Sequence, residues 1–133
     1  LLMATMSGVE VNLMFPCKPD HPFVYWATLS YVGELIMAGA NCYTYDNGFL
    51  HAKGLSIDGK ACCYGTANMD IRSFALNFEV NAMIFDQNIA GEMERIFRED
   101  LKCCTRITKE MYKSRSVWIR FKEQISRLLS PVL

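Results

Sequence analysis

The stretch that decides the fold is Leu50-His51-Ala52-Lys53-Gly54-Leu55-Ser56-Ile57-Asp58-Gly59-Lys60-Ala61-Cys62-Cys63-Tyr64. Residues 50–58 are typical of an extended strand, and Asp58-Gly59 is a strong signal for a two-residue hairpin turn. Residues 60–64 then form the returning strand. The sequence therefore predicts a β-hairpin that brings the segment after residue 64 back beside residue 51.

Reactive side chains flank this hairpin. His51 and Lys53 stand two apart, so on a strand they share one face. The returning strand continues into Gly65-Thr66-Ala67-Asn68 and carries Thr66 and Asn68 toward His51. An imidazole can act as nucleophile or proton carrier, an ammonium can bind phosphate oxygens, and a hydroxyl and an amide add directed hydrogen bonds. These groups together can attack and hold a phosphodiester, and they require no metal.

With Asp58 included, the residues satisfy the pattern HxKxxxxDxxxxxxG(S/T)xN. The segment resembles the HKD motif of the phospholipase D superfamily, and longer stretches narrow the likeness to the second, C-terminal HKD copy of bacterial cardiolipin synthases. These stretches are residues 65–74 (GTANMDIRSF), 76–81 (LNFEVN), 18–22 (KPDHP), 25–27 (YWA) and 128–131 (LLSP). The resemblance covers essentially the whole chain.

The resemblance implies roles for individual residues. The motif histidine, lysine, supporting aspartate, hydroxyl and amide are His51, Lys53, Asp58, Thr66 and Asn68. Glu79 matches a downstream carboxylate that holds the catalytic imidazole in the right tautomer.

Two further residues, Arg72 and Asn77, flank the motif and are candidates for binding a phosphate or a glycerol hydroxyl. An alternative for Arg72 is a simple ion pair with Asp70 or Glu79.

The chain contains a single HKD motif, whereas the family's mechanism uses two histidines that face each other. One attacks phosphorus and becomes a phosphohistidine, and the other protonates the leaving group and later deprotonates the incoming alcohol. Because the chain opens on Leu1 rather than Met, we expect residues 1–133 to be a single C-terminal phospholipase D-like (HKD) domain of a longer protein. The family assigns the nucleophile to the first copy, which favours His51 as the general acid and base.

The resemblance implies a phosphatidyltransferase that converts two phosphatidylglycerol molecules into cardiolipin and glycerol without a cofactor, with this chain inactive alone. The expected partners are phosphatidylglycerol, the N-terminal HKD domain of the same protein and a membrane surface, but no nucleic acid. The expected location is the bacterial cytoplasmic membrane, with the active domain on its cytoplasmic side. The alternatives are a phospholipase D-type hydrolase or nuclease that uses water as acceptor, and a noncatalytic lipid-binding or dimerisation module. A homodimer could also complete the site across a two-fold axis.

Composition agrees with a compact domain. An apolar fraction of 51% over 133 residues is enough for a core, and the formal net charge of zero gives no global signal for nucleic acid or membrane. No apolar run approaches the ~20 residues of a spanning helix. The six cysteines lack the spacing of a metal site, which favours reduced thiols in a reducing compartment.

Alternation of strand-like and helix-like segments predicts a mixed α/β fold, a phospholipase D-like mixed sheet flanked by helices that forms one half of a two-lobed enzyme. We expect helices at residues 1–7, 23–38, 86–102, 108–114 and 116–129, and strands at 9–15, 40–45 and 78–85 besides the hairpin. Gly39 should end the second helix, and residues 16–22 should form a loop.

Two regions have alternative interpretations. The last helix carries an apolar stripe beside several cations, which suits either an interfacial helix on anionic lipid or a helix packed on its own domain. The stripe consists of Val117, Trp118, Phe121, Ile125, Leu128 and Leu129, and the cations are Lys113, Arg115, Arg120, Lys122 and Arg127. Near the second helix, His21, Phe23, Tyr25 and Trp26 could line an acyl or head-group path, or belong to the helix core.

Overall fold

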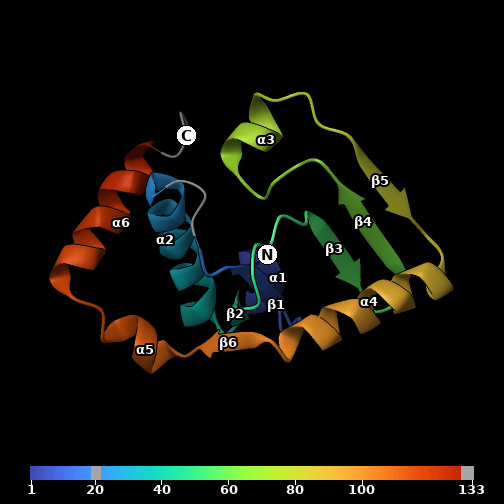
Figure 1. Cartoon of the computed structure of the whole chain (residues 1–133), viewed down its shortest axis with the longest axis horizontal. Helices are drawn as coiled ribbons and strands as arrows, with labels where there is room; N and C mark the ends of the chain where they lie inside the picture. Colours follow the sequence, from blue (N-terminus) through green and yellow to red (C-terminus); the bar gives the residue numbers. More distant parts are fainter. Residues whose placement is uncertain (19–21, 130–133) are drawn as a thin grey trace. The chain divides into compact units, whose positions relative to one another are not determined.

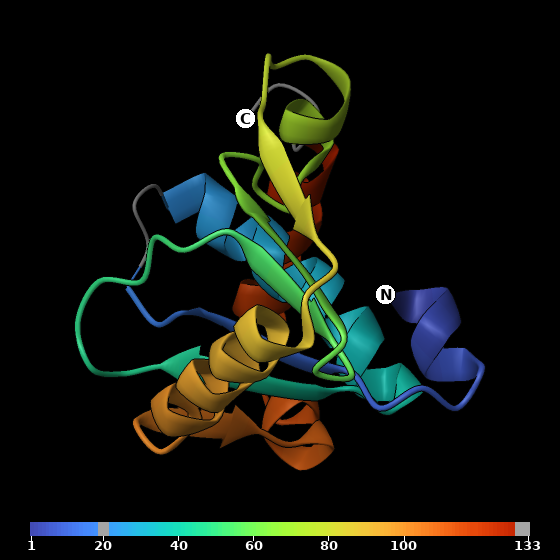
Figure 2. The ribbon, with the colours of Figure 1, turned by 90° about the vertical axis from the view of Figure 1, so that its right-hand side faces the viewer.

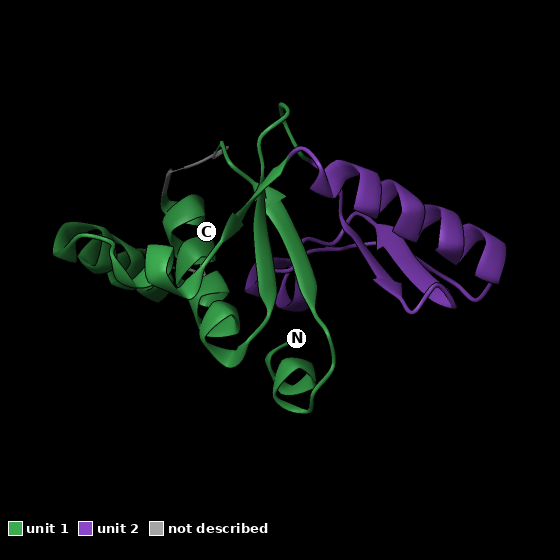
Figure 3. Cartoon of the chain, turned by 90° about the horizontal axis from the view of Figure 1, so that it is seen from below, with its two compact units in different colours: residues 1–50, 104–133 green, residues 51–103 purple. Residues whose placement is uncertain are grey.

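The computed structural model describes residues 1–18 and 22–129 of the chain. They form a mixed α/β structure in which helices flank small sheets (Figure 1), so the predicted fold class is confirmed. The chain divides into two compact units (Figure 3): unit 1 comprises residues 1–50 and 104–133, and unit 2 comprises residues 51–103.

The sheet of unit 1 has three strands in the order β1-β2-β6. β1 (Asn12–Pro16) runs parallel to β2 (Asn41–Tyr45), and β6 (Cys104–Ile107) runs antiparallel to β2. Parallel neighbours need a long crossover. Helix α2 (Pro22–Ala38) provides it, while the short helix α1 (Leu2–Met6) precedes β1.

The end of α2 is set by Gly39, as predicted. Its φ of 112° is one that residues with a side chain rarely adopt. The next residue, Ala40, donates its N–H to the carbonyl of Leu35 at 2.9 Å, which closes the helix end and turns the chain into β2. Phe15 of β1 and Cys42 of β2 are buried against this helix. Together with Ala40 and the buried apolar residues of α2, they form the core of unit 1.

Unit 2 is an antiparallel meander of β3 (Gly54–Ile57), β4 (Ala61–Gly65) and β5 (Asn81–Ile84), with β4 in the middle. The three strands run side by side in Figure 2. Helix α4 (Gln87–Leu101) packs against β3 and β4. It begins where the Asp86 side chain accepts hydrogen bonds from the backbone N–H groups of Asn88 and Ile89 at 2.9 and 3.0 Å.

The hairpin predicted at Asp58-Gly59 is confirmed. Asp58 and Gly59 have φ values of 50° and 61°, and Lys60 donates its N–H to the Ile57 carbonyl at 2.9 Å. Two positive φ values match the right-handed twist of the flanking strands. The connection is one residue longer than expected, because Ile57 pairs with Ala61.

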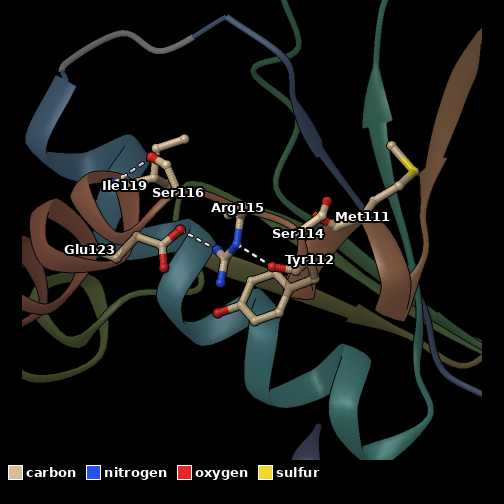
Figure 4. A network of polar contacts seen from close by, with 7 residues as sticks. All are labelled: Met111, Tyr112, Ser114, Arg115, Ser116, Ile119 and Glu123. Carbon is tan, nitrogen blue, oxygen red and sulfur yellow. Dashed lines mark hydrogen bonds and ion pairs between the residues drawn. The ribbon is translucent and has the colours of Figure 1, made fainter.

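The C-terminal part of unit 1 consists of α5 (Lys109–Lys113) and α6 (Val117–Leu129), and α6 packs along α2. Arg115 fixes the junction between α5 and α6 (Figure 4). Its guanidinium lies over the Tyr112 ring, donates to the Tyr112 carbonyl at 2.6 Å and forms an ion pair with Glu123. Burial raises the pKa of Glu123, and the neighbouring Arg115 opposes that shift.

The predicted helices and strands all occur, with ends that differ by up to four residues. Two short elements were not predicted: helix α3 (Ile71–Ala75), between β4 and β5, and strand β6. All six cysteines lie among the described residues, and none of them is in a disulfide.

Candidate active site

The predicted site residues all belong to unit 2, and most of them lie at one end of its sheet. Lys53 directly precedes β3 and His51 lies three residues before it, Thr66 follows β4, and Glu79 stands two residues before β5. Because the three strands are antiparallel neighbours in the order β3-β4-β5, the start of β3, the end of β4 and the start of β5 share one end of the sheet. The hairpin therefore brings the segment around Thr66 beside the segment that contains His51 and Lys53, as predicted.

Lys53 ties the first of these segments in place. Its carbonyl accepts a hydrogen bond from the N–H of Gly65 at 3.3 Å, which extends the β3–β4 pairing toward the site. Its ammonium donates to the carbonyl of His51 at 3.1 Å. This contact holds a positive charge beside the backbone of the candidate catalytic histidine, which is itself exposed.

Thr66 joins the second segment to the third. Its N–H donates to the Val80 carbonyl at 2.9 Å, and its hydroxyl accepts from the Val80 N–H at 2.9 Å. Gly65 makes this approach feasible, because a Cβ there would lie 2.1 Å from the Val80 carbonyl oxygen. The glycine of the motif is therefore required by the close approach of two backbones.

Glu79 is the centre of the hydrogen-bonded cluster. Asn77 donates its side-chain amide to the Glu79 carboxylate at 3.2 Å. The pKa of Glu79 is lowered, chiefly by the hydrogen bond from the Thr66 side chain, then by Asn77, with smaller contributions from Ser73 and the positive charge of Lys53; desolvation opposes them. Thr66, Asn77 and Lys53 thus converge on one carboxylate, while the predicted contact of Glu79 with the imidazole stays a prediction.

Helix α3 positions the remaining candidates. Asp70 caps its first turn by accepting a hydrogen bond from the Ser73 N–H at 2.6 Å. Ser73 is buried, and its hydroxyl accepts from the backbone N–H of Asn68 at 3.2 Å, which fixes the backbone that carries the candidate amide. Arg72 is exposed on this helix, and its carbonyl accepts from the N–H of Asn77 at 2.9 Å.

Asp58 does not join the other candidates. It lies in the turn between β3 and β4, at the opposite end of the four-residue strand β3 from Lys53. A strand of that length spans about 13 Å. Asp58 is thus separated from the segments that carry His51 and Thr66 by the length of β3, and its supporting role stays a prediction.

The site is an open surface of unit 2. Thr66 and Asn68 are exposed like His51, whereas Lys53 and Glu79 are half-buried. Large apolar side chains, also exposed, occur between and beside the polar ones in the sequence: Met69, Phe74, Leu76, Phe78 and Val80. Over the described ranges 1–18 and 22–129, no three His, Cys, Asp or Glu side chains are grouped so as to hold a metal ion.

Sequence reasoning missed two residues that organise the site. Ser73 accepts the backbone N–H of Asn68 through its hydroxyl at 3.2 Å, and Asn81 accepts the N–H of Ala67 through its side-chain oxygen at 3.4 Å. Asp70 is a good N-cap residue for a helix that starts at residue 71, but it does not indicate Ser73, because the cap accepts the backbone N–H of residue 73 whatever its side chain. No local pattern indicated Asn81.

The amino-acid sequence around this cluster, and most of the rest of the chain, matches a known family. The family model described as "Cardiolipin synthase, PLD-like domain" matches residues 1–101. The chain belongs to this cardiolipin synthase family. It is 56% identical over 133 residues to the major cardiolipin synthase ClsA of Bacillus subtilis and 56% identical over the same length to a cardiolipin synthase of Oceanobacillus iheyensis. A cardiolipin synthase of Staphylococcus aureus (strain Mu50) is 56% identical over 131 residues.

Each of these cardiolipin synthases is much longer than the chain described here. The match covers 100% of this chain but only 28% of the Bacillus and Oceanobacillus proteins, and 98% of this chain but 26% of the Staphylococcus protein. The resemblance in the sequence analysis is therefore confirmed for the family, over a segment that spans about a quarter of its relatives. Among the described residues, no helix is both long and apolar enough to cross a bilayer.

Proposed function

We propose that this chain supplies one of two HKD half-sites in an enzyme that makes cardiolipin from two phosphatidylglycerol molecules and releases glycerol. The observation that carries the proposal is the cluster of Lys53, Thr66 and Asn77 around Glu79 beside the exposed His51. This set of groups can bind a phosphate ester and move a proton at its bridging oxygen. Membership of the cardiolipin synthase family supplies the lipid substrate.

In the proposed reaction, a histidine of the other HKD copy attacks phosphorus and forms a phosphohistidine. The P–O bond to glycerol breaks, and the protonated His51 gives its proton to the departing oxygen. A hydroxyl of the second phosphatidylglycerol then gives its proton to His51 and attacks the phosphohistidine, which restores both histidines. One phosphodiester bond is exchanged for another, so no energy source is needed.

The open position of the site supports the role of a half-site. A phosphodiester held by one lobe alone would leave water free access to the phosphohistidine, whereas a facing second lobe would exclude water. We therefore propose that the N-terminal HKD domain of the same protein covers His51, Thr66 and Asn68. A second copy of this chain across a two-fold axis is the alternative cover.

The test is mass-spectrometric measurement of cardiolipin formed by the intact protein that contains this chain. We expect His51→Ala and Lys53→Gln each to lower the rate by about a hundredfold or more, as loss of a general acid–base group or of a charge at the phosphate does. Lys60→Gln is the matched control, because Lys60 lies in the hairpin turn and should not affect the rate. Wild-type turnover by His51→Ala would remove this residue from the mechanism.

The product identifies the acceptor. Cardiolipin as the main product supports transfer between lipids, whereas phosphatidic acid with glycerol would mean that water is the acceptor and that the protein is a hydrolase of the same superfamily. If an intact protein with a correctly folded unit 2 forms neither cardiolipin nor phosphatidic acid, the chain is better explained as a noncatalytic lipid-binding module.

A further inference from the structure

Helix α6 packs on unit 1 with its polar side. Glu123 and Ser126 are only 2% and 1% exposed, and Ser30 of α2 is also buried. Arg127 of α6 forms an ion pair with Glu34 of α2, and its guanidinium lies 4.7 Å from the Tyr31 ring centroid. The polar side of α6 is thus satisfied within unit 1, which is the reverse of an ordinary surface helix.

The opposite side of α6 is apolar and exposed. We call it the α6 stripe, and it consists of Val117, Trp118, Phe121, Ile125, Leu128 and Leu129. Trp118 is 75% exposed and Leu128 is 81% exposed. We considered two interpretations of this helix, an interfacial helix on lipid and a helix packed on its own domain. The helix does pack on its own unit, but it does so with its polar side, and the α6 stripe stays exposed.

A hollow of about 370 Å³ continues the α6 stripe onto α2. Trp118, Phe121 and Ile125 of α6 line it together with Phe23 and Trp26 of α2. Lys122 stands at the same hollow, with its ammonium 5.6 Å from the Trp26 ring centroid. Of the four residues with two interpretations, Phe23 and Trp26 line this hollow, Tyr25 is half-buried, and His21 lies outside the described residues.

Positive charge borders the α6 stripe. Residues 109–129 contain six Lys or Arg and two Glu, although the chain as a whole has no net charge. One of the two carboxylates, Glu123, is buried against Arg115. A second hollow, of about 290 Å³, is lined by Lys113 and Arg120 together with that ion pair.

We propose that the α6 stripe inserts into the interfacial region of an anionic phospholipid bilayer. A helix of 13 residues is about 20 Å long, which is too short to span a bilayer but suits one that lies in its surface. Trp118 and Phe121 would enter the boundary between head groups and acyl chains, while Lys113, Arg120 and Lys122 face lipid phosphates. The basic border favours an anionic lipid over a second protein surface, because lipid phosphates complement every one of these cations.

The first test measures partition of the 133-residue chain onto vesicles by flotation, after circular dichroism shows that each variant is folded. We expect binding to vesicles that contain phosphatidylglycerol and much weaker binding to pure phosphatidylcholine. Trp118→Ser should lower partition about tenfold, and Arg120→Gln or Lys122→Gln about fivefold each. Met6→Ser is the matched control, because Met6 is an exposed apolar residue on α1. Equal binding to both vesicles, or an equal loss in Met6→Ser, would overturn the proposal.

The second test separates the bilayer from other partners of the α6 stripe. Benzoylphenylalanine at position 118 of the intact protein, reconstituted in vesicles with acyl-labelled lipid, should transfer label to the protein on irradiation. Crosslinks within the polypeptide or to a second copy, without lipid label, would show that protein covers the stripe and would overturn the proposal. The inference rests on the proposed function only for its choice of lipid. We expect His51→Ala to lose cardiolipin synthesis and to keep the lipid labelling at position 118, because membrane insertion of the α6 stripe does not depend on the proposed catalytic residue.

Discussion

Glu79 is held in its ionised form by the groups around it. A carboxylate that accepts hydrogen bonds from a hydroxyl and an amide, with an ammonium nearby, binds its proton less tightly than an ordinary carboxyl. The pKa of Glu79 is accordingly below its usual value of 4.5. At neutral pH, Glu79 is therefore a hydrogen-bond acceptor for the groups around it and does not compete for the proton that His51 is proposed to move.

Replacement of Thr66 by Val should raise the pKa of Glu79 toward the ordinary value, because the largest favourable contribution is lost. The measurement is an NMR titration of the Glu79 carboxyl carbon. The lowered pKa stabilises the fold above the ordinary carboxyl pKa, and this stabilisation is lost as the pH falls through the folded value. Thr105→Val in unit 1, where the hydroxyl donates to Asp46, is the control and should leave the titration of Glu79 unchanged. An unshifted pKa in Thr66→Val would contradict this assignment.

At the scale of elements, β4 and β5 meet closely where the motif glycine lies. A Cβ at Gly65 would be 2.1 Å from a backbone oxygen of Val80, which cannot rotate away as a side chain would. The sequence pattern identified the glycine, but only the pairing of Gly65 with Asn81 gives the reason for it.

Gly65→Ala should therefore lower the free energy of unfolding by about 1–3 kcal/mol, the usual cost of forcing an extra carbon into a packed site. Urea unfolding followed by circular dichroism measures this loss. Gly91→Ala in α4 is the matched control, because a Cβ there meets nothing within 4 Å, and we expect it to be neutral or to stabilise by about 0.5–1 kcal/mol. The steric explanation fails if the two variants unfold at the same urea concentration.

The elements that the sequence predicted are those with strong local signals. Asp58-Gly59 fixed the hairpin because both residues tolerate positive φ, and Asp86 and Gly39 marked helix ends through capping. β6 and α3 were missed because four or five residues show too little periodicity, and β6 exists only through its pairing with β2. The docked side of α6 was not predictable either, because an apolar stripe is the same whether protein or lipid covers it.

At the scale of the whole molecule, each unit has its own sheet and its own buried cysteine. Cys42 is fully buried in the core of unit 1, and Cys62 is 1% exposed in the middle strand of unit 2. Burial raises the pKa of the Cys42 thiol to about 11. The candidate site could be predicted from one contiguous motif because unit 2 is continuous in the sequence, whereas unit 1 joins residues 1–50 to the C-terminal segment.

Alkylation by iodoacetamide at pH 8 should label Cys103, which is exposed, well before Cys42 and Cys62. Both buried thiols are shielded from the reagent, and Cys42 is also almost entirely protonated at this pH. Peptide mass spectrometry over a time course gives the order of labelling, and a urea-denatured sample should label all six cysteines. Equal rates for Cys42 and Cys103 in the native chain would contradict the described packing of unit 1.

The continuity of unit 2 has a genetic consequence. All the residues proposed to handle phosphate fall between positions 51 and 79, on a meander whose strands are consecutive along the chain. A single stretch of DNA therefore encodes the complete set, and copying that stretch once, end to end, would yield a pair of matching halves. One such copying event would therefore be enough to encode both of the facing half-sites that we propose.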